Sequence, residues 1–356
     1  MTTPTLPATP APAAPAPAAS TPAAKPSGPI QTGLRGNSSN LAKVLNAGHF
    51  GVCVEVSPPV GPNIEAIERE IKTLKGYGDA YNVTDNQSAM VHVSSLAVSI
   101  MLKQAGMEPV IQFTGRDRNR LGLQGDLLGA SVFGINTVLC LTGDHPIWGD
   151  HPQCKPVYDM DSLNIIRTVR MMRDNQVFEN GKQIPKKAPD FYIGAVENPF
   201  APPYDFRPIR LAKKIVAGAQ FFQTQLIFNV SRFREFMKRV VDLGLHEQCA
   251  IFAGVGPTKS LKVAEYMKNE VAGMDVPDWV LKRMEGLSKE DQQKAGLDVC
   301  LEVSRQVMEI EGVKGLHVMA VNWPAAVPQI VKELGLYPRP AIEAEAAAAA
   351  AGAPGA

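Results

Sequence analysis

The stretch FFQTQLIFNVSRFREFMKRVVDLGLHEQCAIFAGVG, residues 221–256, contains the repeating unit that decides the fold. It opens and closes with continuous apolar runs, 221–229 and 249–256. Between them, apolar side chains recur at spacings of three and four: Phe233, Phe236, Met237 and Val240. This spacing predicts a helix with one apolar face, for which Asn229 or Ser231 is a suitable N-cap. Unbroken apolar runs are typical of parallel strands covered on both faces, so the stretch predicts a strand–helix–strand unit.

Similar apolar runs occur eight times along the chain. They are GVCVEVS (51–57), DAYNVT (79–84), PVIQFT (109–114), TVLCLTG (137–143), FYIGAVEN (191–198), FFQTQLIFN (221–229), CAIFAGVG (249–256) and GLHVMAVN (315–322). Segments between them, such as 64–78 and 207–219, have helical periodicity. Eight such units predict an α/β protein with a (β/α)8 TIM barrel. A doubly wound open sheet is the alternative, but it usually has fewer strands, and no G-x-G-x-x-G motif follows the first run.

The two ends of the chain differ in composition from the barrel. Residues 1–33 are almost entirely Ala, Pro, Thr and Ser, and residues 341–356 are rich in Ala. Neither composition supplies the apolar surface for a core, so we expect a disordered arm and a disordered tail. The arm lacks the charged and apolar regions of a secretory signal. The folded domain is therefore predicted to span residues 48–340.

Charge and cysteine content limit the classes of function. Lys and Arg total 36 against 35 Asp and Glu, which gives a net charge of +1 and predicts neither a nucleic-acid nor a membrane-surface partner. No apolar run is long enough to cross a bilayer. The five cysteines are odd in number and lack CxxC spacing: Cys53, Cys140, Cys154, Cys249 and Cys300. We expect reduced thiols and a cytoplasmic location.

The barrel predicts where the chemistry lies, because active sites of this fold are at the carboxyl ends of the strands. The predicted strand ends carry Glu55, Thr84, Gln112 with Thr114, Asp144, Glu197, Gln225, Gly254 with Gly256, and Asn322. The set contains three carboxylates, several amides and hydroxyls, and no lysine. The absence of lysine argues against Schiff-base chemistry. Outside the loop that follows the fourth run, the predicted strand ends carry no histidine or cysteine.

That loop, TGDHPIWGDHP (142–152), contains two Gly-Asp-His-Pro quartets and suggests a metal site. A metal site in a barrel needs ligands that converge from several strand ends. We therefore predict that His145, Asp150 and His151 belong to a solvated loop and that no metal is bound. Asp144 directly follows the fourth strand and is either a helix cap or a site carboxylate. Its position at the barrel mouth favours the site carboxylate.

Glu55 is an acid within an apolar strand, VCVEVSPP (52–59). Burial of an unpaired carboxylate is costly, so one interpretation is a buried ion pair with Lys or Arg from a neighbouring strand. The predicted strands supply no such cation. The other interpretation is a carboxyl group whose pKa is raised by apolar surroundings, which is the property of a general acid. Gln225 is equally compatible with core hydrogen bonding and with recognition of a flat heterocycle, because a carboxamide both donates and accepts.

Three motifs together resemble the methylenetetrahydrofolate reductase family. They are E-x-x-P-P from Glu55, G-D at the end of the fourth strand, and T-Q-x-x-F from Thr224. The resemblance covers about Phe50 to Pro338. It implies a flavin across the barrel mouth with folate stacked on it, and reduction of 5,10-methylenetetrahydrofolate to 5-methyltetrahydrofolate in one-carbon metabolism, on the route to methionine.

The resemblance also implies roles for individual residues. Glu55 matches the general acid that protonates N10 of the folate, Asp144 the aspartate near the flavin pyrimidine edge and the pterin, and Gln225 the pterin-binding glutamine. The positions that match flavin contacts are Thr84, Gln112, Thr142, Gly143, Asp144, Ala195 and Lys214. Four positions depart from the family pattern: Thr142 replaces an arginine, Ala195 a tyrosine, Gln112 a histidine and Met267 a phenylalanine.

These departures affect the expected cofactors and partners. FAD is the expected flavin, with FMN as the alternative, and direct use of NAD(P)H is left open. The sequence resembles an acetogen-like branch, in which a zinc-containing partner subunit and iron–sulfur proteins deliver electrons. The chain has no cysteine cluster for an electron relay of its own. Two rival functions are a non-catalytic subunit that positions folate for a larger complex, and a TIM-barrel enzyme that binds a phosphorylated substrate at GVGPT (254–258).

Overall fold

The computed structural model describes residues 38–342. The predicted arm (1–33) and all but the first two residues of the predicted tail (341–356) lie outside the described residues.

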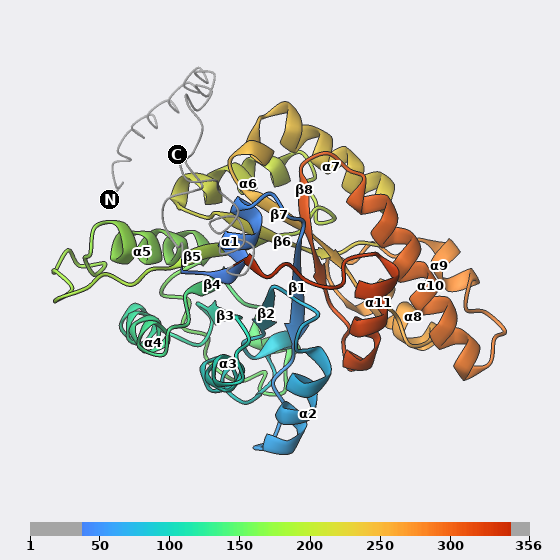
Figure 1. The fold of residues 1–356 in the computed structure, drawn as a ribbon, viewed down its shortest axis with the longest axis horizontal. Coiled ribbons are helices and arrows are strands. Elements are labelled where there is room, and N and C mark those ends of the chain that lie inside the picture. The colour runs from blue at the N-terminus through green and yellow to red at the C-terminus, as the bar shows by residue number, and fades with distance from the viewer. Residues whose placement is uncertain (1–37, 343–356) are drawn as a thin grey trace, which may run out of the picture.

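Eight parallel strands form a closed barrel in which each strand pairs with the next along the chain and β8 pairs with β1 (Figure 1). The strands are β1 (Gly51–Val56), β2 (Ala80–Val83), β3 (Pro109–Thr114), β4 (Thr137–Leu141), β5 (Tyr192–Glu197), β6 (Phe221–Leu226), β7 (Ala250–Val255) and β8 (Val313–Val318). The closed ring confirms the predicted (β/α)8 barrel and excludes the open sheet.

Helices surround the barrel, except that the first of them, α1, lies across one end of it (Figure 1). They are α1 (Asn40–Asn46), α2 (Ile64–Leu74), α3 (Ser95–Gln104), α4 (Arg120–Val132), α5 (Ser162–Asp174), α6 (Phe206–Ala217), α7 (Val230–Asp242), α8 (Leu261–Glu270), α9 (Asp278–Lys282), α10 (Lys289–Met308) and α11 (Val327–Glu333). Short 3-10 turns are η1 (Gln87–Ala89), η2 (Pro146–Trp148), η3 (Leu245–Glu247) and η4 (Pro324–Ala326). Asn229 caps α7, as predicted, by accepting a hydrogen bond from the Arg232 N–H. Among the described helices, none is long and apolar enough to cross a membrane.

Side chains inside the barrel fill its amino-terminal half. One buried cluster joins residues of seven strands and α1: Leu41, Ala42, Cys53, Ala80, Val110, Leu139, Tyr192, Phe221 and Phe252. Gly194 makes room for Phe221, because a Cβ atom there would lie 2.2 Å from the ring. Helix α1 contributes to this cluster and covers the amino-terminal end. The carboxyl end is therefore the end at which a ligand can enter.

The last strand begins and ends earlier than the sequence predicted. The apolar run 315–322 suggested that Asn322 ends the eighth strand, but β8 stops at Val318. Asn322 follows in a loop with a left-handed φ of 55°. The error arose because the apolar character of 319–321 continues beyond the last strand hydrogen bonds. Asn322 is thus not a strand-end residue.

The amino-terminal end of β2 carries a buried ion pair that attaches the end of the described chain to the barrel. Arg339 Nη2 lies 2.6 Å from Asp79 Oδ2 and also donates to the Phe50 carbonyl. Asp79 in turn accepts from the Val52 N–H. A cavity of about 730 Å³ borders this pair, also at the end of the barrel opposite the mouth. Its position makes it a poor candidate for the active site.

Candidate active site

Glu55 lies inside the barrel on β1, opposite Asn82 of β2. Its side chain is 16 % exposed. Burial, and to a smaller extent the nearby charge of Glu70 on α2, raises the pKa of Glu55 to about 7. Within residues 38–342, the basic side chain paired with this carboxyl group is a histidine, His317, and not a Lys or Arg. Glu55 is therefore a largely buried carboxyl group with a raised pKa, which is the property that the general-acid interpretation requires.

His317 is a residue that the sequence argument missed. It lies on β8, next to β1, with Nε2 3.9 Å from Oε2 of Glu55. Burial lowers its pKa to about 3, so the imidazole is neutral. The available signal was a lone histidine in the apolar run GLHVMAVN (315–322), but that run was predicted to end four residues too late. His317 therefore does not lie at the predicted strand end.

Glu197, the third predicted strand-end carboxylate, differs from Glu55 because cations surround it. Lys214 Nζ lies 3.5 Å and Arg207 Nη1 3.8 Å from its carboxylate oxygens. Lys214 is almost fully buried and also donates to the Val196 carbonyl. This arrangement gives Glu197 a structural role. The Lys214 ammonium group is already paired with Glu197 and with the Val196 carbonyl, so a flavin contact would compete with these two interactions.

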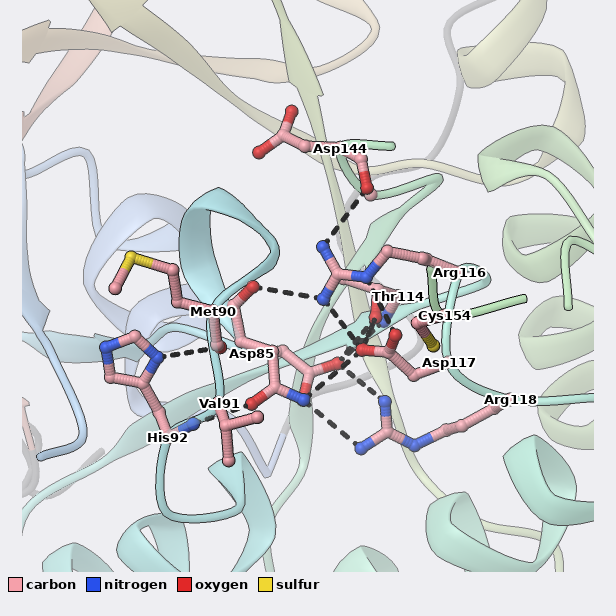
Figure 2. A network of polar contacts seen from close by, with 12 residues as sticks. Asp85, Met90, Val91, His92, Thr114, Arg116, Asp117, Arg118, Asp144 and Cys154 are labelled. Atoms are coloured by element: carbon pink, nitrogen blue, oxygen red, sulfur yellow. Dashed lines mark hydrogen bonds and ion pairs between the residues drawn. The ribbon is translucent and has the colours of Figure 1, made fainter. Parts of the chain in front are cut away.

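Asp144 lies in the loop after β4 with an exposed side chain. It does not cap the following turn, because His145 does so by accepting from the Ile147 N–H. Its backbone carbonyl accepts from Arg116 Nη1 at 3.3 Å. In Figure 2 its carboxylate points away from the polar network beneath it. The backbone is thus held by Arg116 while the carboxylate stays available to a ligand.

That network joins the ends of β2 and β3 and was not predicted (Figure 2). Asp85 accepts from the N–H and hydroxyl of Thr114, both at 2.9 Å, and pairs with Arg118 at 2.6 Å. Arg116, 3 % exposed, pairs with Asp117 at 2.7 Å. The signals were T-D-N and G-R-D-R, which directly follow the second and third apolar runs. These residues lie beyond the predicted strand ends. The network fixes two mouth loops and the backbone of a third.

Thr142 and Gly143 shape the start of the β4 loop. The Thr142 hydroxyl accepts from the Ser162 N–H at 3.0 Å, and the Gly143 carbonyl accepts from Tyr158 at 3.3 Å. Gly143 has a φ of 91°, and a Cβ atom there would lie 3.0 Å from the Arg116 side chain. Glycine is therefore required for the turn that presents Asp144.

Gln225 lies in an irregular part of β6, where the pairing with β7 shifts between Gln223 and Leu226. Such bulges redirect side chains and are common beside active sites. The half-buried Gln225 accepts from the Leu226 N–H at 2.9 Å through Oε1. This bond orients its amide.

The remaining predicted flavin contacts occupy different environments. Thr84 is buried and donates to Gln87 Oε1 at 2.8 Å, while Gln112 is half-buried on β3. Ala195 is fully buried in the apolar layer between strands and helices, so it does not line the mouth. Met267, on α8, belongs to the same layer.

The residues of the Asp-His loop are exposed and paired locally. His151 Nδ1 lies 2.8 Å from Asp150 Oδ1, and Asp150 Oδ2 accepts from the Val91 N–H at 3.1 Å. The hydrogen bond to His151 lowers the pKa of Asp150. In the described part of the chain, no group of three or more His, Cys, Asp or Glu side chains is arranged to hold a metal ion.

Within residues 38–342, several buried polar atoms beneath the mouth lack a hydrogen-bond partner, and they indicate whether the site suits a flavin. Asn82 Nδ2 and Oδ1, Gln223 Oε1 and both ring nitrogens of His317 are buried without a hydrogen-bond partner among the described residues. Leaving such a group unpaired costs about 1–3 kcal/mol. A flat heterocycle with donors and acceptors at its edge, such as a flavin or a pterin, offers partners of the right kind. The residues present therefore fit a flavin at the mouth.

Comparison with known proteins identifies the family. A family model described as methylenetetrahydrofolate reductase matches residues 40–335, which is nearly the whole described chain. The chain belongs to the methylenetetrahydrofolate reductase family. The matched region includes Glu55, Asp144, Gln225 and His317.

Relatives of this family differ in how much of their length the chain covers. It is 24% identical over 254 residues to a probable methylenetetrahydrofolate reductase (NADPH) of Caenorhabditis elegans, covering 71% of this chain but 36% of that protein. A Schizosaccharomyces pombe methylenetetrahydrofolate reductase 2 is 23% identical, with 68% and 38% covered. The chain thus spans little more than a third of these two relatives. It covers 95% of a 5,10-methylenetetrahydrofolate reductase of Salmonella typhimurium, at 24% identity over 85% of this chain.

A solved structure shares the fold. An uncharacterized Clostridium thermocellum protein that binds two copies of 5-methyl-5,6,7,8-tetrahydrofolic acid superposes with a TM-score of 0.61 at 14% identity, covering 83% of this chain and 99% of that one. At this identity the similarity supports the barrel fold alone.

Proposed function

We propose that this chain catalyses the flavin-dependent reduction of 5,10-methylenetetrahydrofolate to 5-methyltetrahydrofolate in one-carbon metabolism. The observation that carries the proposal is Glu55. In a barrel of this family, the mouth contains a buried carboxyl group with a pKa of about 7, paired with no Lys or Arg in the described chain.

Glu55 supplies the proton that the substrate needs. When Glu55 protonates N10, the C–N10 bond of the five-membered ring breaks and an iminium forms at N5 of the folate. The bound flavin, when reduced, supplies the hydride that turns this iminium into a methyl group. A general acid with a pKa near the working pH is effective, because it is substantially protonated and still acidic enough to transfer the proton.

Asp144 and Gln225 position the rings. The Asp144 carboxylate is held at the mouth by its backbone bond to Arg116. With a flavin bound at the mouth, the negative charge of Asp144 would disfavour the anionic reduced form and make the reduced flavin a stronger reductant. The oriented amide of Gln225 donates to and accepts from the edge of the pterin.

The proposal also includes the type of flavin and the source of its electrons. We infer FAD, with FMN as the alternative. NAD(P)H is one donor, because the nematode relative is named for NADPH. The alternative electron donors are iron–sulfur proteins that act with a zinc-containing partner subunit. All five cysteines are free thiols, four of them buried, so the chain relays no electrons itself. Free thiols also support a cytoplasmic location.

The geometry of residues 254–258 argues against the alternative function, an enzyme that binds a phosphorylated substrate there. A Cβ atom at Gly256 would lie 2.2 Å from the Met319 carbonyl oxygen, so this backbone is packed against the neighbouring loop. The Thr258 hydroxyl is buried and lies 3.8 Å from the Met284 sulfur. The segment is therefore covered and does not present its N–H groups as a phosphate cradle.

The test is to purify the full chain, record its visible spectrum, and identify the extracted cofactor. Anaerobic incubation with reduced methyl viologen and 5,10-methylenetetrahydrofolate should then form 5-methyltetrahydrofolate, detected by mass spectrometry. A flavin-bound chain that forms no product with this donor supports the folate-positioning subunit instead. Product formation by a flavin-free chain with NAD(P)H would overturn the flavin requirement and leave the substrate assignment intact.

A further inference from the structure

His317 lies beside the proposed acid because the barrel closes. Pairing of β8 with β1 places His317 next to Cys53, one inward-facing position before Glu55. The imidazole Nε2 and the carboxyl Oε2 are 3.9 Å apart. This distance is longer than a hydrogen bond. Catalytic hydrogen bonds are commonly long before substrate binds and shorten in the complex.

The imidazole has the right charge and hydrogen-bonding capacity to serve a neighbouring carboxyl group. His317 is 4 % exposed, and neither ring nitrogen has a partner among the described residues. A neutral imidazole carries one N–H donor and one acceptor nitrogen. An unpaired buried donor is costly, so the ring gains from any acceptor that comes within reach. The Oε2 atom of Glu55 lies 3.9 Å from Nε2, within the range of an ion pair.

We propose that His317 is a positioning residue for Glu55: its Nε2–H donates to Oε2 of the carboxyl group and thereby turns the protonated oxygen, Oε1, toward the folate. This inference rests on the proposed function. The proton on Oε1 moves to N10 of the substrate, and the carboxylate left behind keeps the hydrogen bond from His317. His317 neither gains nor loses a proton in this step, and its lone donor stabilises the anion that forms.

The other titratable groups near Glu55 do not supply this donor. Glu70, on α2, is an acid whose pKa burial raises to about 7, and its charge opposes ionisation of Glu55. Cys53, below Glu55 on β1, has a pKa raised by burial and accepts from Gln223 Nε2 at 3.1 Å. Asn82, opposite Glu55 on β2, has an amide without a partner among the described residues, but it does not titrate. His317 is thus the titratable donor that faces Glu55 from an adjacent strand.

The experiment compares His317→Leu and His317→Gln with wild type. Leucine fills the space without a donor, whereas glutamine restores an N–H. His246→Leu is the matched control, because His246 also has a ring nitrogen without a partner, but on η3 before β7. Infrared difference spectra against Glu55→Gln report the protonated Glu55 carboxyl band as a function of pH, without folate. Single-turnover rates with folate are measured over the same pH range.

Loss of a donor to the carboxylate raises the pKa of the acid. In His317→Leu the infrared midpoint should move upward by about one pH unit, and the folate step should slow about tenfold. His317→Gln should recover most of both effects, and His246→Leu should match wild type.

An unchanged midpoint in a folded His317→Leu protein would overturn the proposal, as would equal effects in the leucine and glutamine variants. A moved midpoint in a chain whose wild type forms no methyltetrahydrofolate would refute the proposed function and leave the contact standing.

Discussion

Replacement of Glu55 by glutamine should stabilise the protein at high pH. Burial raises the pKa of Glu55 from 4.5 to about 7, so the folded state binds more protons at this site than the unfolded state between these values. The free energy of unfolding therefore falls as pH rises through this window. A shift of this size corresponds to about 3 kcal/mol above pH 7, at about 1.4 kcal/mol per unit. Glutamine has the same shape and no charge to bury.

Urea unfolding at pH 5 and pH 8 measures this effect without any substrate. Glu55→Gln should differ little from wild type at pH 5 and exceed it by up to about 3 kcal/mol at pH 8. Release of the repulsion between Glu55 and Glu70 acts in the same direction. Glu65→Gln, at an exposed position of α2, is the control for loss of one negative charge. A Glu55→Gln protein that is equally stable relative to wild type at both pH values would refute the assignment of a buried, protonated acid.

Three further predictions follow from other parts of the structure. Arg339→Ala should lower the free energy of unfolding by about 3–5 kcal/mol in urea titrations, because it leaves Asp79 buried without its cation; a loss below 1 kcal/mol would contradict this. Asp144→Asn should retain flavin and raise its reduction potential in a redox titration, and an unchanged or lower potential would exclude the electrostatic role. Removal of divalent metals with a chelator, or His151→Ala in the exposed loop, should leave the rate of folate reduction unchanged, and loss of activity restored by one metal would show that the Asp-His loop binds it.

The barrel and its principal acid were predictable because each leaves a local signal. Eight apolar runs separated by segments of helical periodicity predict the barrel. An acid within an apolar strand that is followed by two prolines indicates a functional carboxyl group. His317 leaves no such signal, since its meaning depends on the pairing of β8 with β1, which joins residues that lie far apart in the chain. The pairing of Lys214 with Glu197 is a second example, because it joins a helix to a strand and no local pattern reports it. The flavin contact that the family resemblance implies for Lys214 stays a prediction. The network around Asp85 depends on loop conformation, which periodicity does not report.

The most direct test of the central claim separates reduction of the flavin from its reoxidation by folate. Glu55 is assigned a task only in the second step. In stopped-flow spectra, Glu55→Gln flavin should accept electrons from dithionite about as fast as wild type. Reoxidation of the reduced variant by 5,10-methylenetetrahydrofolate should be slower by a factor of about 10² to 10⁴, the usual contribution of a positioned general acid. Reoxidation at the wild-type rate would contradict the account and leave Glu55 as a buried structural acid.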